Sequence, residues 1–331
     1  MKSVYMAIVL AVAFGSAIAQ NNPVFRMEDR IRIREAMLLK RSYGEKIWKG
    51  ISQTPFTILL IRDSVEFLIN HPNPGEDFQY LGEDSMLQSK IYFRKAKYNP
   101  GFLATFPAVN GMPTIVAGTP EQTGKNSSEW IITLLHEHFH QYQWADPHYR
   151  SSINELDLSR GDQTGMWMLN YPFPYEKPEV EAQYSTYARA LVACIKNLEN
   201  TNFKTLLDQY MTERNKLKAL LDSSDYRYFS LQIWQEGMAR YAEFKFLSVM
   251  TGYTPTVECS QLSDFQPFSD LKNKYYKREL NNITALELSK EKRIVFYSLG
   301  FGEGLLLDKI NKNWRDLYNR EKFFIEKYFR L

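Results

Sequence analysis

The sequence contains five histidines, and four of them lie between residues 136 and 148. Two of these form the pattern His136-Glu137-x-x-His140. In an α-helix, residues four apart lie one turn apart on the same face, so both imidazoles can reach one metal ion. A glutamate beside the first histidine is typical of catalytic zinc sites, where it takes a proton from the attacking water. We therefore predict that His136 and His140 bind zinc and that Glu137 is the general base.

The residues around this pattern predict a helix over residues 127–143. Asn126 is suited to cap its N-terminus, and Glu129 stands three residues later, as in a capping box. Apolar residues recur at helical spacing along one face: Ile131, Leu135, Phe139 and Tyr142. His138 lies roughly 200° around the helix from His136, so we interpret it as a packing residue or a support for the site. The alternative is an ordinary helix whose histidines bind no metal.

A catalytic zinc site needs a third protein ligand and an open position for water. Its best source is the segment 231–244, in which Glu236, Arg240 and Glu243 fall on one helical face. Small residues in the same segment would let its helix approach the first one closely: Gly237, Ala239 and Ala242. An ordinary amphipathic helix with an exposed Glu–Arg–Glu face has the same spacing, so the spacing alone leaves the third ligand open.

Together these two segments resemble the gluzincin metallopeptidases. The second motif of that family often reads W-x-x-E-G-x-A-x-Y-x-E, and this chain has Trp234-Gln-Glu-Gly-Met-Ala-Arg-Tyr-Ala-Glu243, one residue shorter at its start. The resemblance implies that His136, His140 and Glu236 are the zinc ligands and that Glu137 is the general base. It also implies that Glu243 supports the site by orienting a ligand histidine.

Other residues compete for the place of the third ligand. Glu179 and Glu181 lie in a Glu-x-Glu-Ala sequence that is similar to a helix of another zinc peptidase family. Asp146 stands six residues after His140, where metzincins place their third ligand, but the glycine of that motif is replaced by Gln143. His148 follows a proline and is expected to lie off the helix. These alternatives stay open at the level of sequence.

A third element resembles the aminopeptidase branch of the gluzincins. Tyr297-Ser-Leu-Gly300 is similar to the Tyr-x-x-Gly segment of that branch, whose tyrosine hydroxyl stabilises the tetrahedral oxyanion. The resemblance implies the same catalytic role for Tyr297. A tyrosine that precedes a glycine is also common in protein cores, and Tyr226 and Tyr228 are competing candidates.

Two departures from that branch are plain. There the third ligand follows the second histidine by about twenty residues, whereas His140 and Glu236 are 96 positions apart here, so we expect two inserted helices. The branch also carries a Gly-x-Met-Glu-Asn edge strand that holds the substrate's amino terminus. This chain has Asn110-Gly-Met-Pro113 there, without the glutamate. We expect residues 113–117 to keep the edge strand, which can pair with an extended peptide.

The first twenty residues predict a targeting signal. Lys2 is the only charged residue among them, an apolar run covers residues 4–14, and Ala17-Ile18-Ala19 fits a cleavage site before Gln20. We interpret residues 1–19 as a signal peptide and expect a secreted or periplasmic protein, without stable membrane insertion after cleavage. The alternative is an uncleaved membrane anchor. The sequence leaves open whether Cys194 and Cys259 form a disulfide.

Composition and pattern predict an α+β chain with a sizeable core. The chain has 331 residues, 44% of them hydrophobic, and a net charge of +3, which argues against disorder and against a nucleic-acid partner. Short β-type runs precede residue 120, and helical spacing dominates afterwards. We predict a mixed or antiparallel sheet formed by five strands: 56–61, 65–69, 90–94, 102–106 and 114–117. We predict seven helices: 27–51, 127–143, 179–198, 201–222, 229–250, 285–312 and 314–329.

This pattern and the resemblance lead to one expected architecture and function. After the signal peptide, residues 20–331 are expected to form a single zincin-like catalytic domain, sheet-rich over 52–120 and helical over 126–331. The expected function is a secreted zinc metallopeptidase that acts on peptide or protein substrates. Two alternatives remain: an aromatic-rich binding protein on a degenerate peptidase scaffold, and a zinc hydrolase of non-peptide amides or esters.

Overall fold

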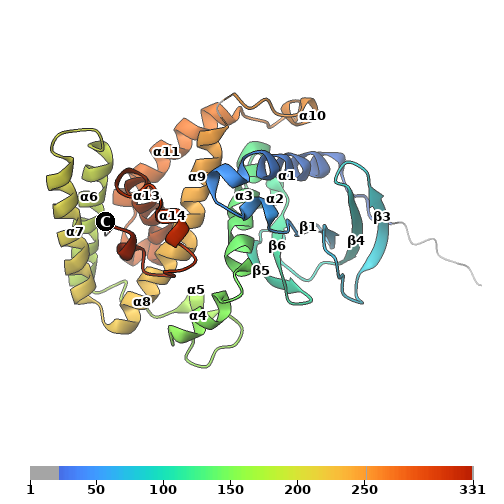
Figure 1. Ribbon diagram of the computed structural model, residues 1–331. Helices are drawn as coiled ribbons and strands as arrows, with labels where there is room; N and C mark the ends of the chain where they lie inside the picture. Colours follow the sequence, from blue (N-terminus) through green and yellow to red (C-terminus); the bar gives the residue numbers. More distant parts are fainter. Residues whose placement is uncertain (1–21, 251, 330–331) are drawn as a thin grey trace, which may run out of the picture.

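The computed structural model describes residues 22–250 and 252–329 (Figure 1). The predicted signal peptide, residues 1–19, lies outside the described residues. Within them, a six-stranded sheet forms one part of the molecule and a group of helices forms the other. One helix, then six consecutive strands, and then helices alone confirm the predicted α+β class.

The sheet is mixed. Along the chain its strands are β1 Ile58–Arg62, β2 Val65–Ile69, β3 Gln79–Asp84, β4 Ser89–Lys95, β5 Leu103–Val109 and β6 Met112–Gly118. In space their order is β3-β4-β2-β1-β6-β5. β1 and β6 run parallel, and the other neighbouring pairs run antiparallel. β1 is buried on both faces: Ile58 and Leu60 belong to the main core, while Leu59 and Ile61 belong to a smaller cluster on the opposite face.

The edge strand next to the helices is β5, and this corrects the sequence expectation. Residues 113–117 belong to β6, which lies between β1 and β5 and therefore has both edges paired. Within residues 22–250 and 252–329, β5 pairs only with β6, on one side, and six of its seven residues are partly accessible. The pairing of β5 with β6 shifts register between Phe106 and Val109, around Pro107. Proline cannot donate to a strand ladder, so it is tolerated at such an edge.

Four helices surround the place where the sheet meets the helical part. α1 (Met27–Ile47) packs against α3 (Ser127–Ala145), which also contacts β5 and β6. α9 (Met238–Val249) packs on α3, and α13 (Val295–Ile310) packs on α9. α3 therefore lies between the sheet and the helices α9 and α13 (Figure 1). This position gives α3 contact with both parts of the molecule.

The remaining helices complete the helical part. They are α2 Pro120–Thr123, α4 Tyr149–Glu155, α5 Trp167–Asn170, α6 Pro178–Lys196, α7 Phe203–Leu220, α8 Ser223–Gln232, α10 Val257–Ser260, α11 Phe268–Ala285, α12 Leu288–Glu291 and α14 Trp314–Leu317. None of the helices in the described part of the chain is long and apolar enough to cross a bilayer. Cys194 and Cys259 are buried free thiols.

Several predicted elements differ from the observed ones. The predicted helix 285–312 is not continuous: α11 ends at Ala285, α12 covers only Leu288–Glu291, and α13 begins at Val295. The predicted helix 314–329 is also wrong, because only α14 and a short 3₁₀ turn form there and Phe323 has a left-handed backbone, with φ 71°. The first helix ends at Ile47, before a 3₁₀ turn. β3 and α11 were not predicted.

Candidate metal centre

The helix that carries both histidines begins as the sequence predicts. The Asn126 side chain accepts a hydrogen bond from the backbone N–H of Glu129, at 2.9 Å, and the Glu129 carboxylate accepts one from Asn126 N, at 3.4 Å. This capping box satisfies two backbone donors that a helix end leaves unpaired. Ile131, Leu135 and Phe139 are fully buried. Capping and the buried face together fix the rotation of α3, and thereby the direction in which the histidines point.

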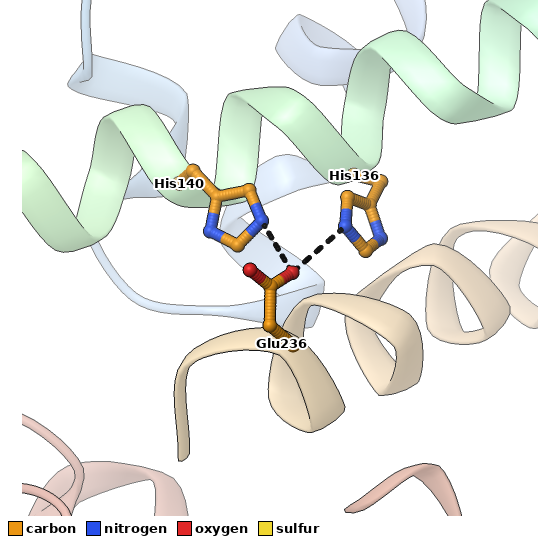
Figure 2. A group of neighbouring side chains, drawn as sticks. All are labelled: His136, His140 and Glu236. Carbon is orange, nitrogen blue, oxygen red and sulfur yellow. Dashed lines mark ion pairs between the residues drawn. The ribbon is translucent and has the colours of Figure 1, made fainter. Parts of the chain in front are cut away.

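His136, His140 and Glu236 come together in one group. The Glu236 Oε2 atom lies 3.3 Å from His140 Nε2 and 3.9 Å from His136 Nε2 (Figure 2). One ligand atom from each of the three residues lies within 4.8 Å of the others. The segment 231–244 thus brings Glu236 to the histidines, although 96 positions separate it from His140.

This spacing fits a zinc ion. With metal–ligand distances of about 2.0–2.1 Å and tetrahedral angles, two ligand atoms lie about 3.3 Å apart. The distance between His140 Nε2 and Glu236 Oε2 equals this value, and that between His136 Nε2 and Glu236 Oε2 exceeds it by a fraction of an ångström. Two imidazoles and one carboxylate are also a donor set typical of catalytic zinc sites. The buried group could therefore hold a metal ion, and its donors fit zinc.

Glu236 lies on an irregular turn of helix. The helix that begins at Ser223 contains a π-helical turn at Ile233–Gly237 before it continues as α9. Insertions of this kind occur frequently at functional sites, because they turn a side chain away from the regular helical positions. The turn places Glu236 toward α3 (Figure 2). The predicted helix 229–250 is therefore present, but it begins earlier and is not regular.

Two glycines allow this turn to lie directly against α13. A Cβ atom added to Gly237 would lie 2.6 Å from Gly300 Cα, and one added to Gly300 would lie 2.4 Å from Gly237 Cα. The two backbones therefore touch, which any larger residue would prevent. Tyr297 lies one turn before Gly300 on α13. The same crossing thus sets the positions of Glu236 and Tyr297.

The electrostatics of the group favour a cation. Burial by itself would raise the pKa of the Glu236 carboxyl, but His140 and His136 hold this pKa well below its usual range. Burial would lower the pKa of His136, but Glu236 and Glu243 raise it to about 9. The pKa of His140 is also raised against the effect of burial, chiefly by Glu236. The carboxylates therefore stabilise positive charge between the imidazoles, which a bound metal dication would supply instead.

Each of the two histidines has a side-chain oxygen close to its other ring nitrogen. His136 Nδ1 lies 3.3 Å from Glu243 Oε2, which is the supporting position that the gluzincin resemblance implies for Glu243. His140 Nδ1 lies 2.7 Å from the side-chain oxygen of Gln143. Gln143 also donates to the Gln235 backbone oxygen, at 2.9 Å. Such partners keep the Nε2 atoms free for a metal.

The supporting role of Gln143 can be tested by a substitution that keeps its size. Gln143→Met removes the hydrogen bonds to His140 and to the Gln235 backbone, and we expect it to weaken zinc binding by about 10- to 100-fold. Gln141→Met is the matched control, because Gln141 is equally buried on α3 but contacts His138, which is not a ligand. Zinc affinity would be measured by competition with a chelator. Equal losses in both variants would contradict the role of Gln143.

The Glu137 side chain is held by the edge strand. The Thr105 hydroxyl, on β5, lies 2.9 Å from both Glu137 Oε2 and the Glu137 backbone oxygen. Glu137 is buried. The structure therefore fixes the predicted general base beside the open edge of the sheet. Sequence reasoning missed Thr105, because nothing in its surroundings along the chain distinguishes it from other strand residues.

Tyr297 lies beside the histidines. Its ring is parallel to that of His136, with centroids 6.3 Å apart. It also lines a cavity of about 270 Å³ together with Arg240 and Glu243. Its competitors point elsewhere: Tyr226 donates to Glu326, and Tyr228 donates to the backbone oxygen of Met168.

The competing metal ligands lie apart from this group. Glu179 is exposed, and Glu181 accepts a hydrogen bond from Ser289. Asp146 pairs with Lys322 after the end of α3, and His148 is exposed.

His138 is a packing residue. It is fully buried and faces away from the ligands, with Nε2 3.1 Å from the Ile51 backbone oxygen. Burial lowers its pKa to about 4.

Comparisons with family models, with curated proteins and with solved structures found no match for this chain.

Proposed function

We propose that this protein is a secreted zinc metallopeptidase of the gluzincin type, with a zincin-like catalytic domain over residues 20–331. One observation carries the proposal. The Glu236 carboxylate lies within 4 Å of the Nε2 atoms of both His136 and His140, while Glu137 lies between them on the same helix. Metal-assisted hydrolysis of this type requires two histidines and one glutamate as ligands. It also requires a second glutamate that does not bind the metal.

Each residue of the site has its own role in the proposed reaction. When bound to His136, His140 and Glu236, zinc would supply a Lewis acid that activates water and polarises the substrate carbonyl. Glu137 accepts a proton from the attacking water and later gives it to the departing amine. Thr105 holds the carboxylate of Glu137 in place by its hydrogen bond. Tyr297 donates a hydrogen bond to the oxyanion that forms at the carbonyl oxygen.

The open edge of β5 favours a peptide as the substrate. An extended peptide can add to an unpaired strand edge through main-chain hydrogen bonds. β5 is the last strand of the sheet, and its Thr105 contacts Glu137. A peptide paired with β5 would therefore pass close to the general base. The apolar N-terminal segment supports secretion or export to the periplasm, with cleavage near Ala19.

Metal analysis tests the centre directly. We expect the purified chain to bind one zinc ion, and His136→Ala or Glu236→Ala to weaken binding by more than about 100-fold, since losing a ligand costs more than losing its supporting partner. Glu179→Ala is the matched control, because it removes an exposed glutamate that the sequence leaves as a rival ligand. Zinc would be counted by mass spectrometry after dialysis. A zinc-free wild-type chain would favour a binding protein instead.

Activity completes this test. We expect a chelator to stop peptide hydrolysis and added zinc to restore it. A chain that binds zinc but cleaves only non-peptide amides or esters would contradict the peptide substrate and leave the metal centre intact.

A further inference from the structure

Two arginines flank the ring of Tyr297. The guanidinium carbon of Arg240 lies 5.4 Å from the ring centroid, and that of Arg293 lies 5.7 Å away. The two differ in their other contacts. Arg240 pairs with Glu243 at 3.0 Å, on the His136 side of the group. Arg293 donates from Nη1 to the Tyr297 hydroxyl oxygen at 2.9 Å, and the same atom lies 3.8 Å from Glu236 Oε1.

The position of Arg293 depends on an unusual backbone. Lys292, the residue before it, has φ 50° and ψ −130°. Residues other than glycine rarely adopt this conformation. It lies in the turn that joins α12 to α13, directly before Arg293. Strain of this kind is maintained only when surrounding contacts require it.

The contact between Arg293 and Tyr297 restricts the direction of the tyrosine proton. A guanidinium only donates hydrogen bonds and never accepts them. Because Arg293 occupies a lone pair of the Tyr297 oxygen, the tyrosine must direct its own O–H elsewhere. A donor that is already oriented stabilises a developing oxyanion better than one that must reorient.

We propose that Arg293 is a positioning residue, which orients the Tyr297 hydroxyl as the hydrogen-bond donor to the oxyanion of the reaction. This inference rests on the proposed function for its catalytic meaning and on the observed contacts for its geometry. The simpler alternative is that Arg293 only neutralises Glu236. The two differ in one respect: a positioning residue acts through Tyr297, whereas a neutralising residue acts through metal binding.

A double-mutant cycle separates the two. Tyr297→Phe should lower kcat about 10²- to 10³-fold, as the loss of an oxyanion donor does. We expect Arg293→Met to lower kcat by at least about tenfold with KM and zinc content unchanged, and the double variant to lose no more than Tyr297→Phe. Arg293→Lys should restore part of the loss. Independent losses in the double variant, or a loss of zinc in Arg293→Met, would overturn the proposal.

Lys46→Met is the matched control. Lys46 is exposed and also lies over a tyrosine, Tyr43, at 5.4 Å from its ring centroid, but this pair is on α1 and has no contact with His136, His140 or Glu236 among the described residues. We expect this variant to keep the wild-type kcat.

A second readout needs no activity. With ¹³C-labelled tyrosine, the ring-carbon resonance that disappears in Tyr297→Phe identifies Tyr297. We expect Arg293→Met to shift this resonance and Lys46→Met to leave it in place. An unmoved resonance would refute the contact itself. A shifted resonance in a chain without peptidase activity would uphold the positioning and refute the proposed function, so the two failures are distinguishable.

Discussion

Glu137→Gln is expected to retain zinc and to lose peptide hydrolysis, with kcat lower by roughly 10²- to 10⁴-fold. Glutamine has nearly the shape of glutamate, so the fold and the metal ligands should be unaffected. It cannot accept the proton of the attacking water, and the reaction therefore loses its base. Zinc content, thermal unfolding and steady-state kinetics on a peptide mixture would measure the three quantities separately.

The comparison for this variant is a second glutamate from the same region. Glu155→Gln changes an exposed residue of α4 and should keep both zinc and activity. His140→Ala should lose both. If Glu137→Gln cleaves peptides at the wild-type rate, the assignment of the base is wrong, even where the zinc site is real.

Gly300→Ala is expected to destabilise the protein and weaken zinc binding together. Helix propensity alone predicts the opposite sign, because alanine stabilises a helix interior by about 1 kcal/mol relative to glycine. The added Cβ, however, would lie 2.4 Å from Gly237 Cα, so the backbones of α13 and the π-helical turn must separate. Overpacking of this kind costs about 1–3 kcal/mol or more. The separation also moves Glu236 from the histidines.

Gly302→Ala is the matched control on the same helix. The three atoms nearest to its Cβ would be the ends of flexible side chains, those of Ile283, Leu191 and Ile195. We expect a smaller loss of stability and no change in zinc affinity. Chemical denaturation and chelator competition would measure both. A stabilised Gly300→Ala variant would show that the crossing tolerates a methyl group and does not control the ligand.

The site was predictable where its chemistry is local. His136 and His140 share one helix, and Asn126 and Glu129 mark its start, so spacing alone predicts their geometry. Glu236 came from a resemblance, because its meeting with α3 depends on tertiary packing between distant segments. Gln143 lies three residues after His140 and could have been found by its helical spacing. Thr105 and Arg293 could not, since their roles arise only from contacts across the fold.

The fold was least predictable where packing overrides local pattern. β3 carries the polar sequence Gln79–Asp84 and lacks the apolar alternation that identifies a strand. Residues 314–329 have helical spacing of aromatic residues, but Trp314 and Tyr318 pack on the ring of Trp48 instead of forming one face of a regular helix. The prediction of a helix from residue 285 missed the break at Leu286. The backbone of Leu286 is extended, and no strong local signal in the sequence indicates this.

The open edge of β5, which would bind a peptide, also carries a risk of aggregation. The same main-chain groups that would receive a peptide can also receive a strand from another copy of the chain, which is the first step of aggregation. Pro107 and the register shift beside it interrupt β5 after four regularly paired residues, Leu103–Phe106. An edge this short can pair with a few residues of a peptide. It offers a growing fibril few backbone groups for strand pairing.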